Sequence, residues 1–130
     1  MSSVFTKIIN REIPSYKIAE NEQYYAFLDI NPLAKGHTLV IPKKEIDNLF
    51  DLDEELYKGL FLFAKKVANA MEKTISCRKI GVAVVGLEVP HAHIHLVPMN
   101  TVNDINFTQP KLKSSDTELS AVAEKIRANF

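Results

Sequence analysis

Three of the four histidines in this chain occupy alternate positions in one short segment, at His91, His93 and His95. In a β-strand, residues two positions apart point to the same face of the sheet. The spacing therefore predicts that the three imidazoles share one face and that the apolar residues between them share the other. Since the apolar face must pack on a core, we expect the histidine face to line a cleft or the surface.

A row of histidines can carry out chemistry near neutral pH, because imidazole can act there as nucleophile, acid or base. The middle ring, His93, can attack while a neighbouring ring orients it or protonates a leaving group. Crowding three rings disfavours charging all of them, so at least one is expected to stay neutral and nucleophilic. That neutral ring needs a hydrogen-bond acceptor behind it to fix its tautomer.

Two other interpretations of the histidine row stay open at this point. The rings could be solvated strand residues without a role, or they could bind a transition metal, with His37 as a fourth nitrogen ligand. Zinc ligands usually lie at tetrahedral angles, which one flat strand supplies awkwardly. Cys77 is the only cysteine, so a cysteine-based zinc site and a disulfide within the chain are excluded. We therefore expect that no metal and no cofactor is required.

Length and charge limit the class of protein further. The 130 residues suit one domain, 1–130, with one hydrophobic core. Sixteen basic and sixteen acidic residues cancel, whereas a nucleic-acid-binding surface needs a basic excess or a basic stripe. The first residues lack the apolar core of a signal peptide, and no apolar run is long enough to cross a bilayer. The expectation is a cytoplasmic protein that binds neither nucleic acid nor membrane.

The apolar periodicity and the turn residues predict an α+β protein with an antiparallel sheet and its helices on one face. Asp51 is the predicted N-cap of the longest helix, because Glu54 follows it three residues on. A stripe of apolar residues from Leu52 to Met71 marks the buried side of that helix. The expected elements are a helical turn at Val4–Asn10, strands at Ser15–Glu20, Tyr24–Ile30 and His37–Ile41, a helix from Asp51 to about Ser76, a buried strand at Lys79–Val85, a strand at His91–Pro98 and a helix at Asp116–Asn129.

The segment from His91 to Val97 resembles the signature of the histidine triad (HIT) family, in which three histidines alternate with apolar residues. Three upstream segments also resemble family motifs, in the order in which the family has them. They are Val4–Ile9, Phe27–Pro32 and Gly36–Lys44. The resemblance covers about residues 4–99 and is closest to the nucleoside phosphoramidase branch. It implies a HIT-like fold of five antiparallel strands and two main helices, with the sheet continued across a homodimer.

The resemblance also implies a purine nucleoside 5′-phosphate ligand and a two-step reaction. His93 would attack the α-phosphorus to form a nucleotidyl-histidine, and water would then release the monophosphate. His91 and His95 would orient that ring and contact phosphate oxygens, with His37 behind them. Asp29 would bind the ribose, since a carboxylate accepts two hydroxyl hydrogen bonds well. The remaining nucleotide-binding residues are expected to be Phe5, Ile8, Phe27 and Ile30 around the purine, and Gly86 and Glu88 near the phosphate.

The chain departs from the family pattern just before the histidine row. Leu87 and Glu88 stand where the pattern has a glutamine and a hydroxyl residue that contact phosphate. A carboxylate cannot donate a hydrogen bond at neutral pH, and it repels phosphate. Our hypothesis is that Glu88 favours an amine leaving group, as in an adenosine phosphoramidate. The alternatives are a dinucleoside polyphosphate hydrolase and a nucleotide-binding regulatory module with little turnover.

Overall fold

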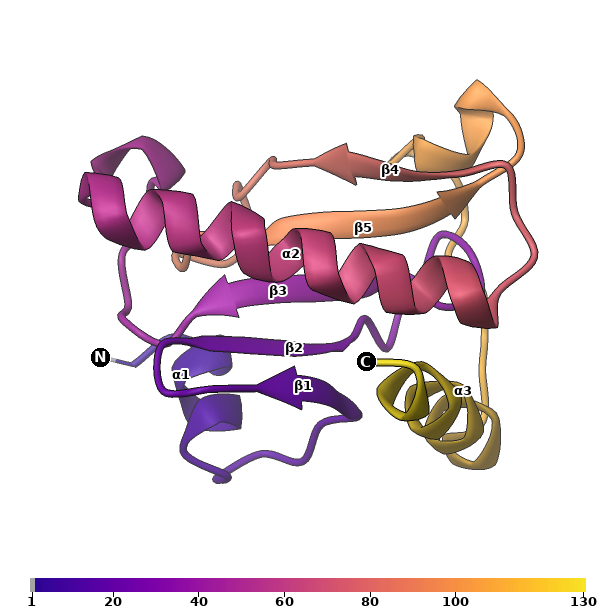
Figure 1. Ribbon diagram of the computed structural model, residues 1–130, viewed down its shortest axis with the longest axis horizontal. Coiled ribbons are helices and arrows are strands. Elements are labelled where there is room, and N and C mark those ends of the chain that lie inside the picture. Colours follow the sequence, from indigo (N-terminus) through magenta and orange to yellow (C-terminus); the bar gives the residue numbers. More distant parts are fainter. Residues whose placement is uncertain (1) are drawn as a thin grey trace.

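The computed structural model describes residues 2–130, whose strands form one antiparallel sheet in the order β1-β2-β3-β5-β4 (Figure 1). The predicted α+β class and the five-stranded antiparallel sheet are therefore confirmed. The strands are β1 Lys17–Glu20, β2 Tyr24–Leu28, β3 Thr38–Pro42, β4 Lys79–Ala83 and β5 Ile94–Met99, and the helices are α1 Val4–Ile9, α2 Glu54–Thr74 and α3 Asp116–Ala128, with 3-10 turns at Leu49–Asp51 and Val102–Ile105.

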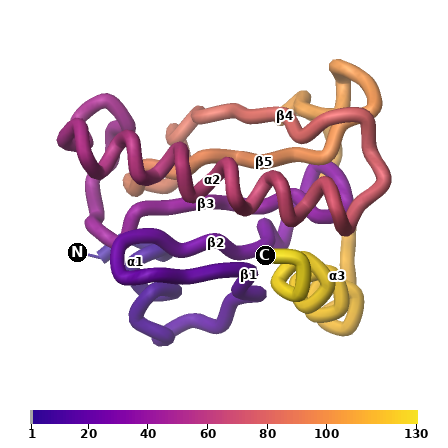
Figure 2. Tube along the Cα trace, in the orientation of Figure 1, coloured from indigo at the N-terminus to yellow at the C-terminus, as the bar shows by residue number. Residues whose placement is uncertain are grey.

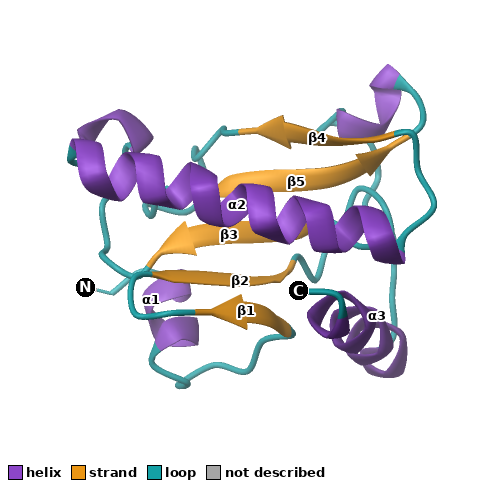
Figure 3. Ribbon diagram, in the orientation of Figure 1, coloured by secondary structure: helices purple, strands orange, loops and turns teal. Residues whose placement is uncertain are grey.

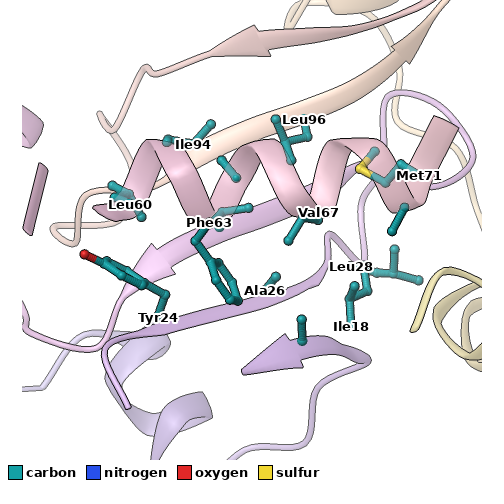
Figure 4. Packing of buried hydrophobic residues seen from close by; sticks show 14 of the residues in the cluster. Ile18, Tyr24, Ala26, Leu28, Leu60, Phe63, Val67, Met71, Ile94 and Leu96 are labelled. Carbon is teal, nitrogen blue, oxygen red and sulfur yellow. The ribbon is translucent and has the colours of Figure 1, made fainter. Parts of the chain in front are cut away.

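Helix α2 lies across one face of the sheet and carries most of the core (Figure 4). Leu60, Val67 and Met71 are fully buried on its sheet-facing side, as the predicted stripe required. The N-cap is Asp53 rather than Asp51, and its Oδ1 accepts a hydrogen bond from the Leu56 N–H at 2.8 Å. Asp51 cannot serve because it already belongs to the 3-10 turn, whereas Asp53 has the extended backbone that an N-cap requires.

The three helices do not all lie on one face of the sheet, which corrects the prediction. Helix α3 packs against β1 and α2 on the α2 side, while α1 lies behind the sheet (Figure 3). The reason is the alternation along β2 and β3. Phe27 and Leu39 point away from α2, and Phe5 and Ile8 of α1 cover them in a second apolar cluster.

The strand predicted as buried at Lys79–Val85 is exposed for much of its length. It becomes β4, which lies at the edge of the sheet and pairs only with β5. The Val82 side chain is 55% exposed and Val85 is 48% exposed. An apolar strand at an open edge leaves a row of backbone groups that another chain could pair with.

The strand predicted from His91 begins only at Ile94, because the preceding backbone bonds outside the sheet. The His91 N–H donates to the Val89 carbonyl, and the Ala92 N–H donates to the Ile46 carbonyl. The alternation nevertheless persists through this segment. Ala92 and Ile94 face the α2 side and are buried in the main core, as predicted.

The segment between β5 and α3 returns along one end of the sheet towards the C-terminal helix (Figure 2, orange to yellow). The Leu112 N–H donates to the Pro32 carbonyl at 2.9 Å, which fixes this segment beside the loop that follows β2.

In the described part of the chain, no helix combines the length and the apolar character that a membrane span would need.

Candidate active site

A cavity of about 460 Å³ opens on the face of the sheet opposite α2. Ten of the eleven residues that the sequence singled out line this cavity, and only His91 does not. The ten are Phe5, Ile8, Phe27, Asp29, Ile30, His37, Gly86, Glu88, His93 and His95. Residues that lie up to 90 positions apart in the chain thus line one cavity.

One end of the cavity is apolar and aromatic. Phe5 and Phe27 meet edge to face, with ring centroids 5.5 Å apart. Phe5 also packs edge-on against His93 at 5.0 Å, so the apolar end adjoins the histidines directly. Ile8 is buried in the same cluster, whereas Ile30 is 61% exposed and lies at the mouth. A flat ring placed here would meet aromatic and aliphatic surfaces.

The proton of the His93 ring can be assigned from its one hydrogen-bond partner. His93 Nδ1 lies 2.7 Å from the backbone carbonyl oxygen of His91, and a carbonyl can only accept. In the neutral form of the ring, Nδ1 therefore carries the proton and Nε2 keeps its lone pair. Nε2 of His93 has no hydrogen-bond partner among residues 2–130. Because every buried side-chain nitrogen or oxygen of these residues has a partner, Nε2 is not buried and is accessible from the cavity.

His91 is fully buried, and its ring is held by groups outside the cavity. Its Nε2–H donates to the Pro42 carbonyl at 2.7 Å, so Nδ1 accepts from the Ser3 hydroxyl at 2.9 Å. The Ser3 N–H donates in turn to Glu45. We therefore revise the expectation that the His91 ring contacts phosphate. In this structure it fixes the backbone carbonyl that orients His93.

His37 and His95 form a chain of hydrogen bonds with one direction. The Leu33 N–H donates to His37 Nδ1 at 3.0 Å, so the proton of the neutral His37 ring is on Nε2. That Nε2–H donates to His95 Nδ1 at 2.9 Å, and the remaining proton of His95 is therefore on its Nε2. His95 Nε2 has no hydrogen-bond partner among the described residues, and it is not buried. The series of hydrogen bonds therefore ends in an N–H donor towards the cavity.

The environment keeps these two rings neutral. Burial lowers the pKa of His37 to about 4, with further lowering by the charges of Lys111 and His93. Burial likewise lowers the pKa of His95 to about 3, with His93, His37 and Lys111 adding to the effect. Burial also lowers the pKa of His91. The spacing predicted that crowding would disfavour charging the whole cluster, but burial is the larger cause for these three rings, and the charge of His93 adds to it.

Asp29 follows β2 and lies beside the His37 ring. Its Oδ1 accepts from the Asn31 N–H at 2.8 Å, and its Oδ2 lies 3.7 Å from His37 Nε2. Because His37 is neutral near pH 7, this pair is not a salt bridge. Burial raises the pKa of the Asp29 carboxyl, and the Glu88 charge contributes in the same direction. Oδ2 is therefore the carboxylate oxygen free to accept hydroxyl donors.

Asp29, His37 and His95 also place three potential ligand atoms within 4.8 Å of one another, which could hold a metal ion. An ion there would have to displace the proton that His37 donates to His95. The hydrogen bond and the metal site are therefore mutually exclusive uses of the same atoms. The hydrogen-bonded arrangement is the one expected for two neutral imidazole rings.

The turn before the histidine row forms one rim of the cavity. Gly86 has φ +68°, a backbone conformation that favours glycine, and no atom lies within 4 Å of the position of a Cβ there. Leu87 is 88% exposed and Glu88 is exposed, so both lie at the mouth. The departure from the family pattern thus places a carboxylate at the entrance.

Comparison with known proteins decides the family. Residues 10–102 match the HIT domain. The chain belongs to the HIT family. It is 33% identical over its whole length to the adenosine 5′-monophosphoramidase of Schizosaccharomyces pombe, covering 99% of that protein. An uncharacterized HIT-like protein of Borreliella burgdorferi is 36% identical over 90% of this chain and 95% of its own length. The crystal structure of a Hit-like protein from Bartonella henselae superimposes with a TM-score of 0.86 at 34% identity, over 99% of this chain and 96% of the other.

Two residues that line the cavity lie beyond the HIT match and were missed by the sequence analysis, namely Phe107 and Lys111. The Phe107 ring packs edge-on against His95, with centroids 4.7 Å apart. Ser3, which holds His91, was also missed. Its position before α1 is a readable N-cap signal, but no local signal indicates a bond to a residue 88 positions away.

Proposed function

We propose that this HIT protein hydrolyses a purine nucleoside 5′-phosphoramidate at its α-phosphorus, through a nucleotidyl intermediate on His93. One observation carries the proposal. The His91 carbonyl fixes the proton of His93 on Nδ1, so that Nε2 offers its lone pair to a cavity with an aromatic end. A nucleophile of this kind requires a neutral ring with an oriented tautomer.

The first step forms a bond between His93 Nε2 and phosphorus and breaks the bond between phosphorus and the leaving nitrogen. The departing amine takes a proton, for which the Nε2–H of His95 is the donor that the His37 hydrogen bond prepares. In the second step, water attacks phosphorus, the bond to Nε2 of His93 breaks, and the proton that the water loses returns to Nε2 of His95. The nucleoside monophosphate leaves, and the neutral His93 is restored.

The binding residues support a nucleoside as the substrate. The aromatic end, formed by Phe5 and Phe27, suits a purine, and the free Oδ2 of Asp29 suits the ribose hydroxyls. The resemblance to the phosphoramidase of Schizosaccharomyces pombe points to the same class of substrate. No cofactor enters either step.

The leaving group is the finer part of the proposal. Glu88 at the mouth would attract a cationic amine and repel a second polyphosphate arm. We therefore expect an adenosine phosphoramidate of a lysine-like amine to be a better substrate than a diadenosine polyphosphate. In Glu88→Ser this preference should shrink. An unchanged preference would show that Glu88 plays no part in it.

The assay that tests the function compares turnover of an adenosine phosphoramidate by wild type and by His93→Asn. The asparagine amide can still donate to the His91 carbonyl but offers no nucleophilic nitrogen. We expect a loss of at least about a thousandfold, which is typical when a nucleophile is removed. Wild-type protein that binds the nucleotide without turning it over would instead indicate a regulatory module.

We further propose that two chains pair through β4. This edge strand has apolar side chains that remain exposed, and Leu62 on the neighbouring helix α2 is 63% exposed. Pairing with a second copy would give the backbone groups of the open edge hydrogen-bond partners, and it would bury the apolar side chains. The resemblance to the HIT family implies the same continuous sheet.

A further inference from the structure

The cavity that we assign to a nucleoside phosphate has an unfavourable charge balance for that ligand. Asp29 and Glu88 contribute two carboxylates to its wall. Burial lowers the pKa of His37, His91 and His95, so these rings carry no charge near pH 7. Neither Leu87 nor Glu88 can donate a hydrogen bond from its side chain to a phosphate oxygen. A cation from elsewhere in the chain would offset this charge balance for a phosphate in the cavity.

Among residues 2–130, Lys111 is the one lysine or arginine that lines this cavity. It is exposed and belongs to the segment between β5 and α3, beyond the matched HIT domain. Its charge acts on the groups around the cavity. After burial, it is the next largest cause that lowers the pKa of His37, and it also lowers the pKa of His95 and opposes the raised pKa of Asp29.

The position of Lys111 is fixed by its own segment. Its Nζ donates to the Phe107 carbonyl at 2.7 Å and lies 3.3 Å from the Gln109 carbonyl. The next residue, Leu112, is tied to Pro32 through its N–H, and Phe107 packs on His95. An ammonium group has three protons, so two such bonds leave one for a ligand. The lysine is therefore held in place, and no carboxylate of residues 2–130 forms a salt bridge with it.

We propose that Lys111 contacts the phosphate of the bound nucleotide and replaces the phosphate donors that the turn at Leu87 and Glu88 lacks. The inference rests on the proposed function, because it assumes a nucleoside phosphate in this cavity. It identifies the segment after β5 as a specificity element of this chain. A charge-assisted hydrogen bond from Lys111 would favour nucleotides over nucleosides.

The test measures binding by calorimetry, with adenosine 5′-monophosphate and adenosine as probes, for wild type, Lys111→Met, Lys111→Arg and Lys113→Met. Methionine keeps much of the apolar stem and removes the charge. Lys113 is the matched control, since it lies two residues on and does not line the cavity that His93, His95 and Glu88 line. We expect Lys111→Met to weaken binding of the monophosphate about tenfold or more while leaving adenosine unaffected. Lys111→Arg should restore part of the affinity, and Lys113→Met should resemble wild type.

Three results would overturn this inference. If Lys111→Met binds the monophosphate like wild type, Lys111 does not contact phosphate and the proposed function stands without it. Equal weakening for adenosine and its monophosphate would show that Lys111 only secures its own segment through the Phe107 carbonyl. Wild-type protein that binds neither probe would overturn the proposed function itself, and the role of Lys111 with it.

Discussion

The Nε2–H of His37 donates to Nδ1 of His95 over 2.9 Å, although the two residues are 58 positions apart. The Leu33 N–H fixes the first ring of this pair, and the second ring packs against Phe107 and His93. Both rings have lowered pKa values and are neutral near pH 7. The direction of this bond decides which nitrogen of His95 faces a substrate as a donor.

Replacing His37 tests the hydrogen-bonded pair without removing a residue that attacks phosphorus. In His37→Gln, the side-chain amide can still donate to His95 Nδ1, whereas His37→Leu cannot donate. We expect His37→Leu to lower kcat about a hundredfold, the usual size of a general acid contribution, with His37→Gln losing less. Steady-state kinetics with a phosphoramidate substrate would measure both. Equal activity of the two variants would contradict the direction assigned to the bond.

The neutral histidines should make stability depend on pH. The unfolded chain takes up protons as the pH falls below about 6.5, but folded His37 and His95 resist until about pH 4 and 3. The free energy of unfolding should therefore be highest above pH 7 and should fall between pH 7.5 and 5 by up to about 2 kcal/mol for each ring. Urea unfolding at the two pH values measures this. In His37→Gln the fall should be smaller, and a wild type equally stable at both values would refute the assignment.

Asp29 should govern recognition of the sugar. Its free Oδ2 is expected to accept ribose hydroxyls, and each hydrogen bond to a charged group contributes about 1.5 kcal/mol or more. Asp29→Ala should therefore raise KM for an adenosine phosphoramidate about tenfold or more while hardly changing KM for the 2′,3′-dideoxy analogue. Asn31→Ala is the control, since it keeps the carboxylate. If KM rises equally for both substrates in Asp29→Ala, Asp29 only shapes the turn after β2.

The proposed dimer can be tested at the open edge of the sheet. Val82 is 55% exposed on β4, and Leu112 is 45% exposed beside the loop that follows β2. Light scattering at micromolar concentration should give the mass of two chains for wild type and for Leu112→Arg. Val82→Arg should give the mass of one chain, because a charge buried without a partner would oppose pairing. A wild-type monomer would contradict the proposal.

Periodicity predicted most of the fold, because the residues that decide it are local. The alternation at Ala92 and Ile94 and the stripe on α2 indicated their buried faces correctly. The sequence could not place β4 at the edge, because an apolar strand has the same residue pattern in the centre of a sheet and at its edge. It also could not separate Asp51 from Asp53 as the N-cap, because both precede the same helix.

The site was harder to predict where it depends on contacts between distant segments. The spacing of His91, His93 and His95 indicated a cluster, but only the folded chain shows that His93 is hydrogen-bonded to the backbone carbonyl of His91 rather than to its ring. Lys111 follows Pro110 in a segment without periodicity, so nothing near it in sequence indicates the cavity. Its place beside the cavity follows from the hydrogen bond of the Leu112 N–H and the packing of Phe107.

The central claim is that His93 Nε2 becomes bonded to phosphorus. The most direct measurement is to mix the enzyme briefly with an adenosine phosphoramidate, quench it under alkaline conditions that preserve the bond between phosphorus and nitrogen, and map the adduct by peptide mass spectrometry. We predict a nucleotidyl group on His93 in wild type and none in His93→Asn. An adduct on another residue, or rapid turnover of the substrate by His93→Asn, would contradict it.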